Sequence, residues 1–135
     1  MEPRDVFLVE FRGVTIGSVS TQSSSEEMFQ NEVLRPILKL QNDLFIASFR
    51  NYLAKHKGDF YSQTSEKKLV SIENTVQKDI KYRNTLKGMV IGLFTTEEYL
   101  FYIKNSSNLN KRMMNMLIER LKSQIQLFEA VSTKE

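Results

Sequence analysis

The side chains in this chain that could do acid–base or metal chemistry are few and scattered. There are no cysteines and only one histidine. This excludes thiolate zinc sites, iron–sulfur clusters, cysteine nucleophiles and sites with several imidazoles. His56 stands between Lys55 and Lys57, with no acid or nucleophile beside it. Such a setting is typical of the C-terminal end of a helix, where the dipole favours cations. We therefore assign no catalytic residue, no metal ligand and no cofactor.

Two acidic pairs, at positions 26–27 and 97–98, have the residue type for metal binding or proton transfer. Each pair follows a hydroxyl residue, Ser24 or Thr95, with a glutamate three positions after it. This spacing is a capping box, in which the hydroxyl and the glutamate bond each other's backbone amides. Acids are also favoured there by the helix dipole. The pairs therefore predict two helix starts rather than a reaction centre.

The densest basic stretch, residues 78–87, is the candidate for contacts with nucleic acid. Its cations are Lys78, Lys81, Arg83 and Lys87. Tyr82 and Asn84 lie among them, and cations mixed with aromatic and amide groups suit phosphate and base contacts. On a helix, however, the four cations point to two different sides, and Asp79 dilutes their charge. Nucleic-acid binding is therefore an alternative that we do not favour.

Polar residues interrupt two apolar rows and predict a buried network. The candidates are Gln41, Asn42, Asp43, Arg83 and Asn84. Buried amides and guanidinium groups need hydrogen-bond partners. We expect Arg83 or Asn84 to meet one of the residues 41–43 across the fold, as a structural network or as the floor of a small pocket. A third hypothesis is a small-molecule site or enzyme built on Asp43, Arg83 and a tyrosine at position 52 or 82.

The elements that position these groups are predicted to be helices. Five glycines and two prolines in 135 residues disfavour turn-rich β folds. From Ser24 onward the apolar residues recur at helical spacing, over about 25–34, 36–57, 65–93, 95–104 and 107–129. Pro36 ends or kinks the first helix. Thr64 or Ser65 caps the third helix, which bends or breaks near residue 83.

The chain divides into an N-terminal arm over 1–25, one helical domain over 26–130 and a frayed tail over 131–135. Within the arm, residues 3–11 predict a short helix or a strand, although their apolar residues match neither period well. The Ser/Thr/Gly-rich remainder predicts a loop. The fold class we predict is all-α: a compact bundle of four to six helices with a loosely attached N-terminal arm.

Charge and hydropathy favour a cytoplasmic protein. Nineteen Lys/Arg against sixteen Asp/Glu leave a net charge of +3 with interspersed signs, so electrostatic steering is modest. The longest apolar run covers residues 89–94, far short of the roughly 20 residues of a membrane helix. The first residues include several acids and no apolar secretory core, so we expect no signal peptide. A bacterial cytoplasm is the simplest location, with no membrane partner.

Surplus apolar side chains predict a protein interface. The candidates are Met114, Met116, Ile46 and Phe101, together with Phe7 and Phe11 of the arm. Met114 and Met116 cannot both share the core face of Met113, because neighbouring positions on a helix point in different directions. The leading functional hypothesis is a non-enzymatic helical interaction or regulatory module that pairs with itself, as a homodimer, or with another protein.

Three segments, 34–44, 77–88 and 108–116, resemble a family of short, uncharacterised bacterial proteins, some of which are labelled glyoxalase. The resemblance covers about residues 26–128 and leaves out the arm. The label implies a metal-dependent lyase of paired βαβββ modules with histidine, glutamate and glutamine ligands. One histidine and no such strand pattern supply no matching ligand set, so no functional residue is carried over from the family.

Overall fold

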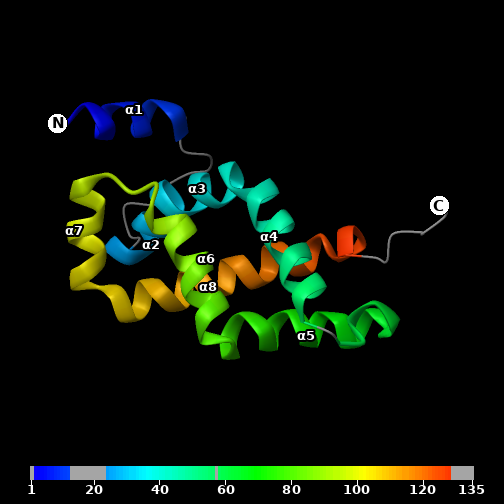
Figure 1. Ribbon diagram of the computed structural model, residues 1–135. Coiled ribbons are helices and arrows are strands. Elements are labelled where there is room, and N and C mark those ends of the chain that lie inside the picture. The colour runs from blue at the N-terminus through cyan, green and yellow to red at the C-terminus, as the bar shows by residue number, and fades with distance from the viewer. Residues whose placement is uncertain (1, 13–23, 57, 129–135) are drawn as a thin grey trace.

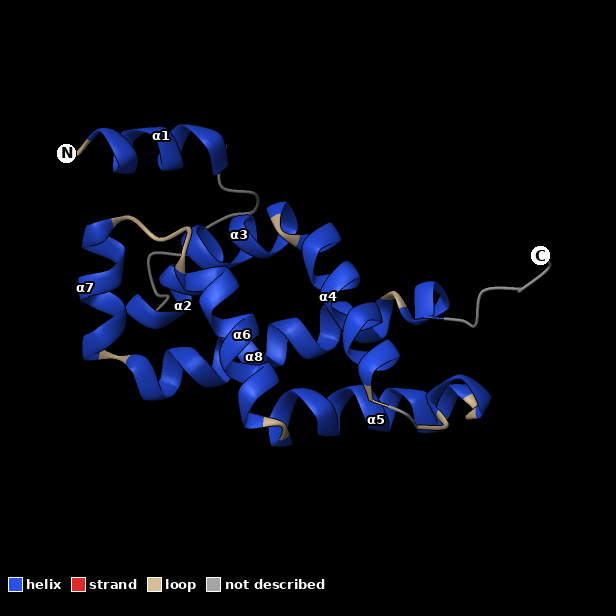
Figure 2. Cartoon of the chain, in the orientation of Figure 1, coloured by secondary structure: helices blue, strands red, loops and turns tan. Residues whose placement is uncertain are grey.

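A computed structural model describes residues 2–12, 24–56 and 58–128, and every regular element within these ranges is helical (Figure 2). The helices are α1 (Pro3–Arg12), α2 (Ser25–Phe29), α3 (Arg35–Leu40), α4 (Asn42–Lys55), α5 (Ser65–Lys78), α6 (Ile80–Ile91), α7 (Thr96–Lys104) and α8 (Ser106–Ser123). A π-helical turn, η1 (Gln30–Leu34), joins α2 to α3, and two 3-10 turns are η2 (Phe60–Ser62) and η3 (Ile125–Phe128). The all-α prediction is confirmed. Because α2, η1 and α3 form one continuous rod, the described body beyond α1 consists of six rods.

Three helices begin at the hydroxyl residues that the spacing predicts. The side chains of Ser24 and Thr64 each accept a hydrogen bond from the backbone amide three residues later, at 3.1 and 3.2 Å. Thr95 forms a complete capping box: it accepts from the Glu98 amide at 3.1 Å, and the Glu98 carboxylate accepts from the Thr95 amide at 2.8 Å. Of the arm, residues 3–12 form the helix α1 rather than a strand. The Ser/Thr-rich loop at 13–23 and the tail lie outside the described residues.

Pro36, which is predicted to end or kink the first helix, does not end it. The preceding turn widens into η1, in which the Arg35 amide bonds the Gln30 carbonyl five residues back. This wider spacing lets the rod pass a proline that lacks an amide hydrogen. The bend comes instead at Gln41, where the backbone leaves helical geometry with φ −89° and ψ 4°. The Gln41 side chain donates to the Met89 carbonyl at 2.9 Å and ties this bend to α6.

The long helix predicted over 65–93 divides at Asp79, four residues before the expected break. Asp79 has extended backbone geometry, and its Oδ1 accepts a hydrogen bond from the Tyr82 amide at 3.1 Å. A short carboxylate at this position satisfies an amide that the start of α6 would otherwise leave unpaired. The polar interruption near residue 83 therefore lies inside α6 and does not mark a helix end.

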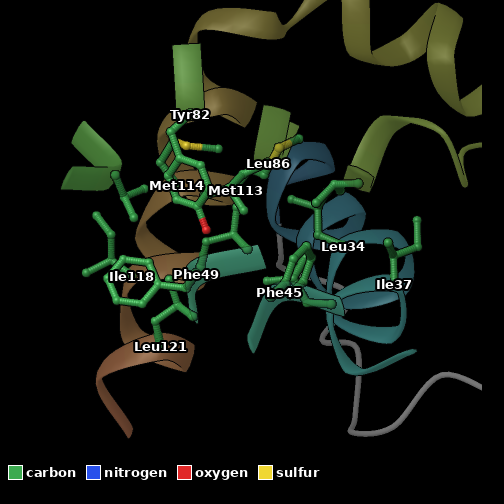
Figure 3. Packing of buried hydrophobic residues seen from close by; sticks show 14 of the residues in the cluster. Leu34, Ile37, Phe45, Phe49, Tyr82, Leu86, Met113, Met114, Ile118 and Leu121 are labelled. Atoms are coloured by element: carbon green, nitrogen blue, oxygen red, sulfur yellow. The ribbon is translucent and has the colours of Figure 1, made fainter. Parts of the chain in front are cut away.

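Helix α8 runs through the middle of the fold and packs against η1, α5, α6 and α7 (Figure 1). Neighbours on several sides bury more than one of its apolar rows, so both Met113 and Met114 lie in the core (Figure 3). Ile46 of α4 is buried in the same core. The prediction that Met114 and Ile46 lie at an interface is therefore wrong, because both side chains are buried in the core. The prediction assumed that a helix buries only one row of apolar residues, and this assumption fails for a helix with neighbours on several sides.

Aromatic rings fix the short turns to this core. Phe49 of α4 packs against Phe60 of η2 and Phe128 of η3, with ring centroids 5.9 and 4.9 Å apart. At the other end, Phe29 of α2 lies edge-on to Phe94 and stacks on Phe101 of α7, at 5.4 and 5.2 Å. Aromatic pairs of this kind add roughly 0.5–1.5 kcal/mol to the burial of their surface. Phe101 is half-buried, because only one of its faces is covered by Phe29.

Candidate functional site

A cleft of about 400 Å³ lies where α4 meets the junction of α5 and α6. The Tyr52 hydroxyl donates to Asp79 Oδ2 at 2.7 Å, and the hydroxyls of Ser48 and Tyr82 share a hydrogen bond of 2.9 Å. His56 stacks on Tyr52 with ring centroids 3.8 Å apart. His56 caps the C-terminus of α4, as its position among lysines predicts. This cleft gathers the aromatic and titratable groups that an enzyme would use.

The protonation states of the cleft do not suit proton transfer. Burial, then the hydrogen bond and charge of Asp79, raise the pKa of Tyr52 to about 12. Burial also raises the pKa of Tyr82 to about 12. The hydrogen bonds from Tyr52 and from the Tyr82 amide lower the pKa of Asp79. At neutral pH both phenols are protonated and the carboxylate is ionised and engaged. The hydrogen bond between Tyr52 and Asp79 therefore joins α4 to the start of α6.

The predicted polar network does not form as expected. Asn42 pairs with Gln124, the residue directly after α8, through two reciprocal amide hydrogen bonds of 2.8 Å. Gln41 bonds the Met89 carbonyl, while Asp43 and Asn84 are exposed. No hydrogen bond among the described residues joins positions 83–84 to positions 41–43. The partner that the sequence analysis missed is Gln124, whose amide interrupts the apolar row of α8 in the same way that Asn42 interrupts that of α4.

Arg83 occupies an unusual position inside α6. Its side chain is half-buried, and its buried Nε has no hydrogen-bond partner among the described residues. Because Asp43 is exposed and makes no hydrogen bond or ion pair with Arg83 within the described ranges, the pocket predicted around these two residues does not assemble.

The basic segment 78–87 is divided between two surfaces. Lys81 is exposed at the rim of the cleft, and Lys78 is exposed at the end of α5. Arg83 and Lys87 are half-buried and do not line the cleft. On α6, Lys81 and Arg83 are two residues apart and therefore point about 200° away from each other. The cations do not form one face that could follow a phosphate backbone.

A second hollow, of about 380 Å³, lies between the start of α3 and the C-terminal part of α8. Arg35, Arg120 and Glu119 line it together with Gln124, and Met116 contributes an apolar wall. Burial, and secondarily the positive charge of Arg35, lower the pKa of Arg120. Met116, one of the predicted interface residues, is half-buried here. Sequence patterning did not single out this hollow, because Arg35 and Arg120 are far apart along the chain.

Helix α1 is attached to the body by its polar side. Arg12 donates to both carboxylate oxygens of Glu98 at 2.7 Å and to the Leu93 carbonyl at 3.1 Å. Asp5 accepts from the Thr96 amide at 3.1 Å and is buried. Arg4 bonds the carbonyls of residues 92 and 94 at 2.9 Å. Polar contacts therefore seat α1 over the end of α6 and the beginning of α7.

The outward side of α1 carries two exposed aromatic rings. Phe7 and Phe11 are 61% and 54% exposed, and their rings stack with centroids 5.4 Å apart. A hollow of about 380 Å³ opens between α1, α2 and α7, and Val9, Met28 and Phe101 supply its apolar lining. Val9 is two residues from each phenylalanine and therefore points about 200° away from both on α1. Of the predicted interface residues, Phe101 thus lines a surface hollow, and the arm's two phenylalanines project from a different side of α1.

The described residues contain no cluster of three or more histidine, cysteine, aspartate or glutamate side chains that could hold a metal ion. None of the described helices combines the length and the apolar composition needed to cross a bilayer. No protein-family model, curated protein or solved structure matches this chain, so its own residues and surfaces are the basis for the function proposed below.

Proposed function

We propose that this protein is a non-enzymatic interaction module that forms a homodimer through the outer face of α1. The observation that carries the proposal is the reversed polarity of this helix. Asp5, Arg12 and the apolar Leu8 face the body, whereas Phe7 and Phe11 face outward. An amphipathic surface helix normally turns its apolar face to the core. A helix held by its polar side supports the presence of a partner for the apolar side.

A second copy of the chain is the partner we propose for this surface. A twofold interface uses the same patch on both subunits, so the stacked pair Phe7–Phe11 of one protomer would pack against the same pair of the other. An anionic membrane is a poorer fit, because residues 2–12 carry three acids and two bases.

The two exposed rings contribute apolar burial to the proposed dimer. A buried aromatic side chain covers 150–250 Å², so the exposed parts of Phe7 and Phe11 amount to roughly 200 Å² for each protomer. At about 25 cal/mol per Å², their burial contributes roughly 5 kcal/mol per protomer.

Nucleic-acid binding by segment 78–87 is not proposed, because Lys81 and Arg83 point away from each other.

The test is the oligomeric state of the double variant F7S/F11S. The unmodified protein should scatter light as a particle of twice the 15.8 kDa chain mass at micromolar concentration, and the variant as a monomer. Both rings are exposed, so the helical circular dichroism of the variant should not change. Val70→Ser is the matched control, since Val70 is 59% exposed on α5 at the far side of the fold from α1 (Figure 1). An unmodified chain that stays monomeric at high concentration, or a variant that still dimerises, contradicts the proposal.

A further inference from the structure

The hollow between α3 and α8 brings together two arginines that form no ion pair among the described residues. Arg35 opens α3, and Arg120 belongs to the last turn of α8. Within the described ranges, neither guanidinium forms an ion pair with a carboxylate. Their hydrogen bonds go to neutral amide oxygens: Arg35 donates to Asn31 at 3.1 Å and Arg120 to Asn42 at 3.4 Å. Most of the donors on both side chains therefore remain available to a ligand.

The two positive charges disfavour each other in the absence of a bound anion. Burial and the charge of Arg35 lower the pKa of Arg120, which means that the hollow stabilises the charged guanidinium less well than water does. A bound anion reverses this effect, because it supplies the opposite charge between the two groups. Like charges held together in a recess are a recognised feature of functional sites.

Hydrogen bonds hold both the guanidinium and the backbone carbonyl of Arg120. The amides of Asn42 and Gln124 bond each other reciprocally, and Asn42 Oδ1 also accepts from the Arg120 guanidinium. Gln124 Nε2 donates to the Arg120 backbone carbonyl at 2.9 Å. Orientation of a charged group before binding lowers the entropy that the complex has to offset. The polar pair between α4 and α8 thus acts as a support for the arginine.

We propose that this hollow binds the dianionic phosphoryl group of a small phosphate monoester between Arg35 and Arg120. A planar guanidinium offers paired donors that match phosphate oxygens, and two of them satisfy a double negative charge. The volume of about 380 Å³ accommodates the phosphoryl group and a small organic substituent, for which Met116 supplies an apolar wall. Glu119 lines the same hollow and repels the anion, which keeps the affinity moderate. This site is separate from α1 and does not depend on the dimer proposed above.

The first experiment titrates the full chain with inorganic phosphate and with phenyl phosphate at low ionic strength, by calorimetry. We expect saturable binding of both, tighter for phenyl phosphate because of Met116. Arg35→Gln and Arg120→Gln should each weaken binding by about tenfold or more, because each removes charge-assisted hydrogen bonds. Glu119→Gln should tighten it. Lys111→Gln is the matched control: it removes one charge from an exposed position on the opposite side of α8 and should change nothing.

The second experiment uses pH and does not depend on the variants. Arginine stays protonated, whereas a phosphate monoester gains its second charge near pH 6. Binding of phenyl phosphate should therefore tighten as the pH rises from about 5 to about 7.5. In NMR spectra of the unmodified chain, the side-chain signals of Arg35 and Arg120 should shift during the titration. The proposal is overturned if neither probe binds up to about 10 mM, if Arg35→Gln binds as well as Lys111→Gln, or if phenyl phosphate binds more weakly than inorganic phosphate.

Discussion

Replacing Arg12 with methionine should release α1 from the body of the protein. The Arg12 side chain is 6% exposed, and its guanidinium holds both oxygens of Glu98 at 2.7 Å and the Leu93 carbonyl at 3.1 Å. Methionine keeps most of the apolar stem and removes these three hydrogen bonds. Removing one partner of a buried ion pair costs about 3–5 kcal/mol, because the remaining charge stays buried without its counterpart.

The lower end of that range applies here. The Glu98 side chain is 19% exposed and keeps its hydrogen bond to the Thr95 amide, so solvent and the capping box still stabilise the carboxylate. A loss of about 3 kcal/mol remains. Because the contact joins α1 to the start of α7, this loss falls on the docking of α1. The rest of the core does not contain Arg12, so global unfolding is affected less than docking.

The assay is native-state hydrogen exchange of the α1 amides. A change of 1.4 kcal/mol is a factor of ten, so the protection of α1 should fall by roughly a hundredfold in Arg12→Met. Arg4→Met is the control, because the Arg4 side chain is 53% exposed and its loss should reduce protection much less. In a Glu98→Gln background the effect of Arg12→Met should shrink, since the ion pair is already lost. Unchanged α1 protection in Arg12→Met would refute the argument that this ion pair seats the helix.

Two further predictions concern the cleft between α4 and α6. The pKa of Asp79 in the folded state lies below its usual 3.8, so the ionised carboxylate stabilises the fold above that pH, and this stabilisation is lost as the pH falls through the folded pKa. Between about pH 5 and about pH 2 the urea midpoint of Asp79→Asn should therefore fall less steeply than that of the unmodified protein. Equal slopes for the two proteins would contradict this prediction. The pKa values of Tyr52 and Tyr82 are raised from 10.0 to about 12, so the folded state keeps protons that the unfolded state releases. The free energy of unfolding should therefore decline from pH 10 towards pH 12, and it should decline less in Tyr82→Phe. A urea midpoint of the unmodified protein that stays constant over this pH range would disprove the prediction.

Local signals in the sequence predict the helix starts well, because a cap depends on only a few neighbouring residues. Thr95 and Glu98 form the expected capping box, and Ser24 and Thr64 accept the expected amides. The same reasoning fails at Pro36, where the missing amide predicts a break. The rod continues because η1 changes the hydrogen-bond spacing one turn earlier. The wider spacing of a π-helical turn has no clear signature in side-chain periodicity, so the sequence cannot show it.

Contacts between distant elements are harder to predict. The sequence marks Asn42 and Arg83 as polar residues that need partners, but it does not say which partner lies opposite. Asn42 bonds Gln124, whereas the buried Nε of Arg83 has no hydrogen-bond partner among the described residues. The reason is the central place of α8, which packs against α5, α6, α7 and η1 and so comes within reach of α4 (Figure 1). The arginine hollow is invisible to the sequence for the same reason, since it depends on where α8 ends relative to α3.

The arm shows why an ambiguous pattern can itself be informative. Residues 3–11 fit neither a buried helix nor a buried strand, because the periodicity rules assume that apolar side chains face the core of the same chain. In α1 the inward residues, at helical spacing, are Asp5, Leu8 and Arg12, and the aromatic pair Phe7 and Phe11 lies one helical turn apart outside. The pattern becomes regular once the apolar side is assigned to a surface beyond the chain. The outward position of this aromatic pair is the reason why we propose the dimer interface at Phe7 and Phe11.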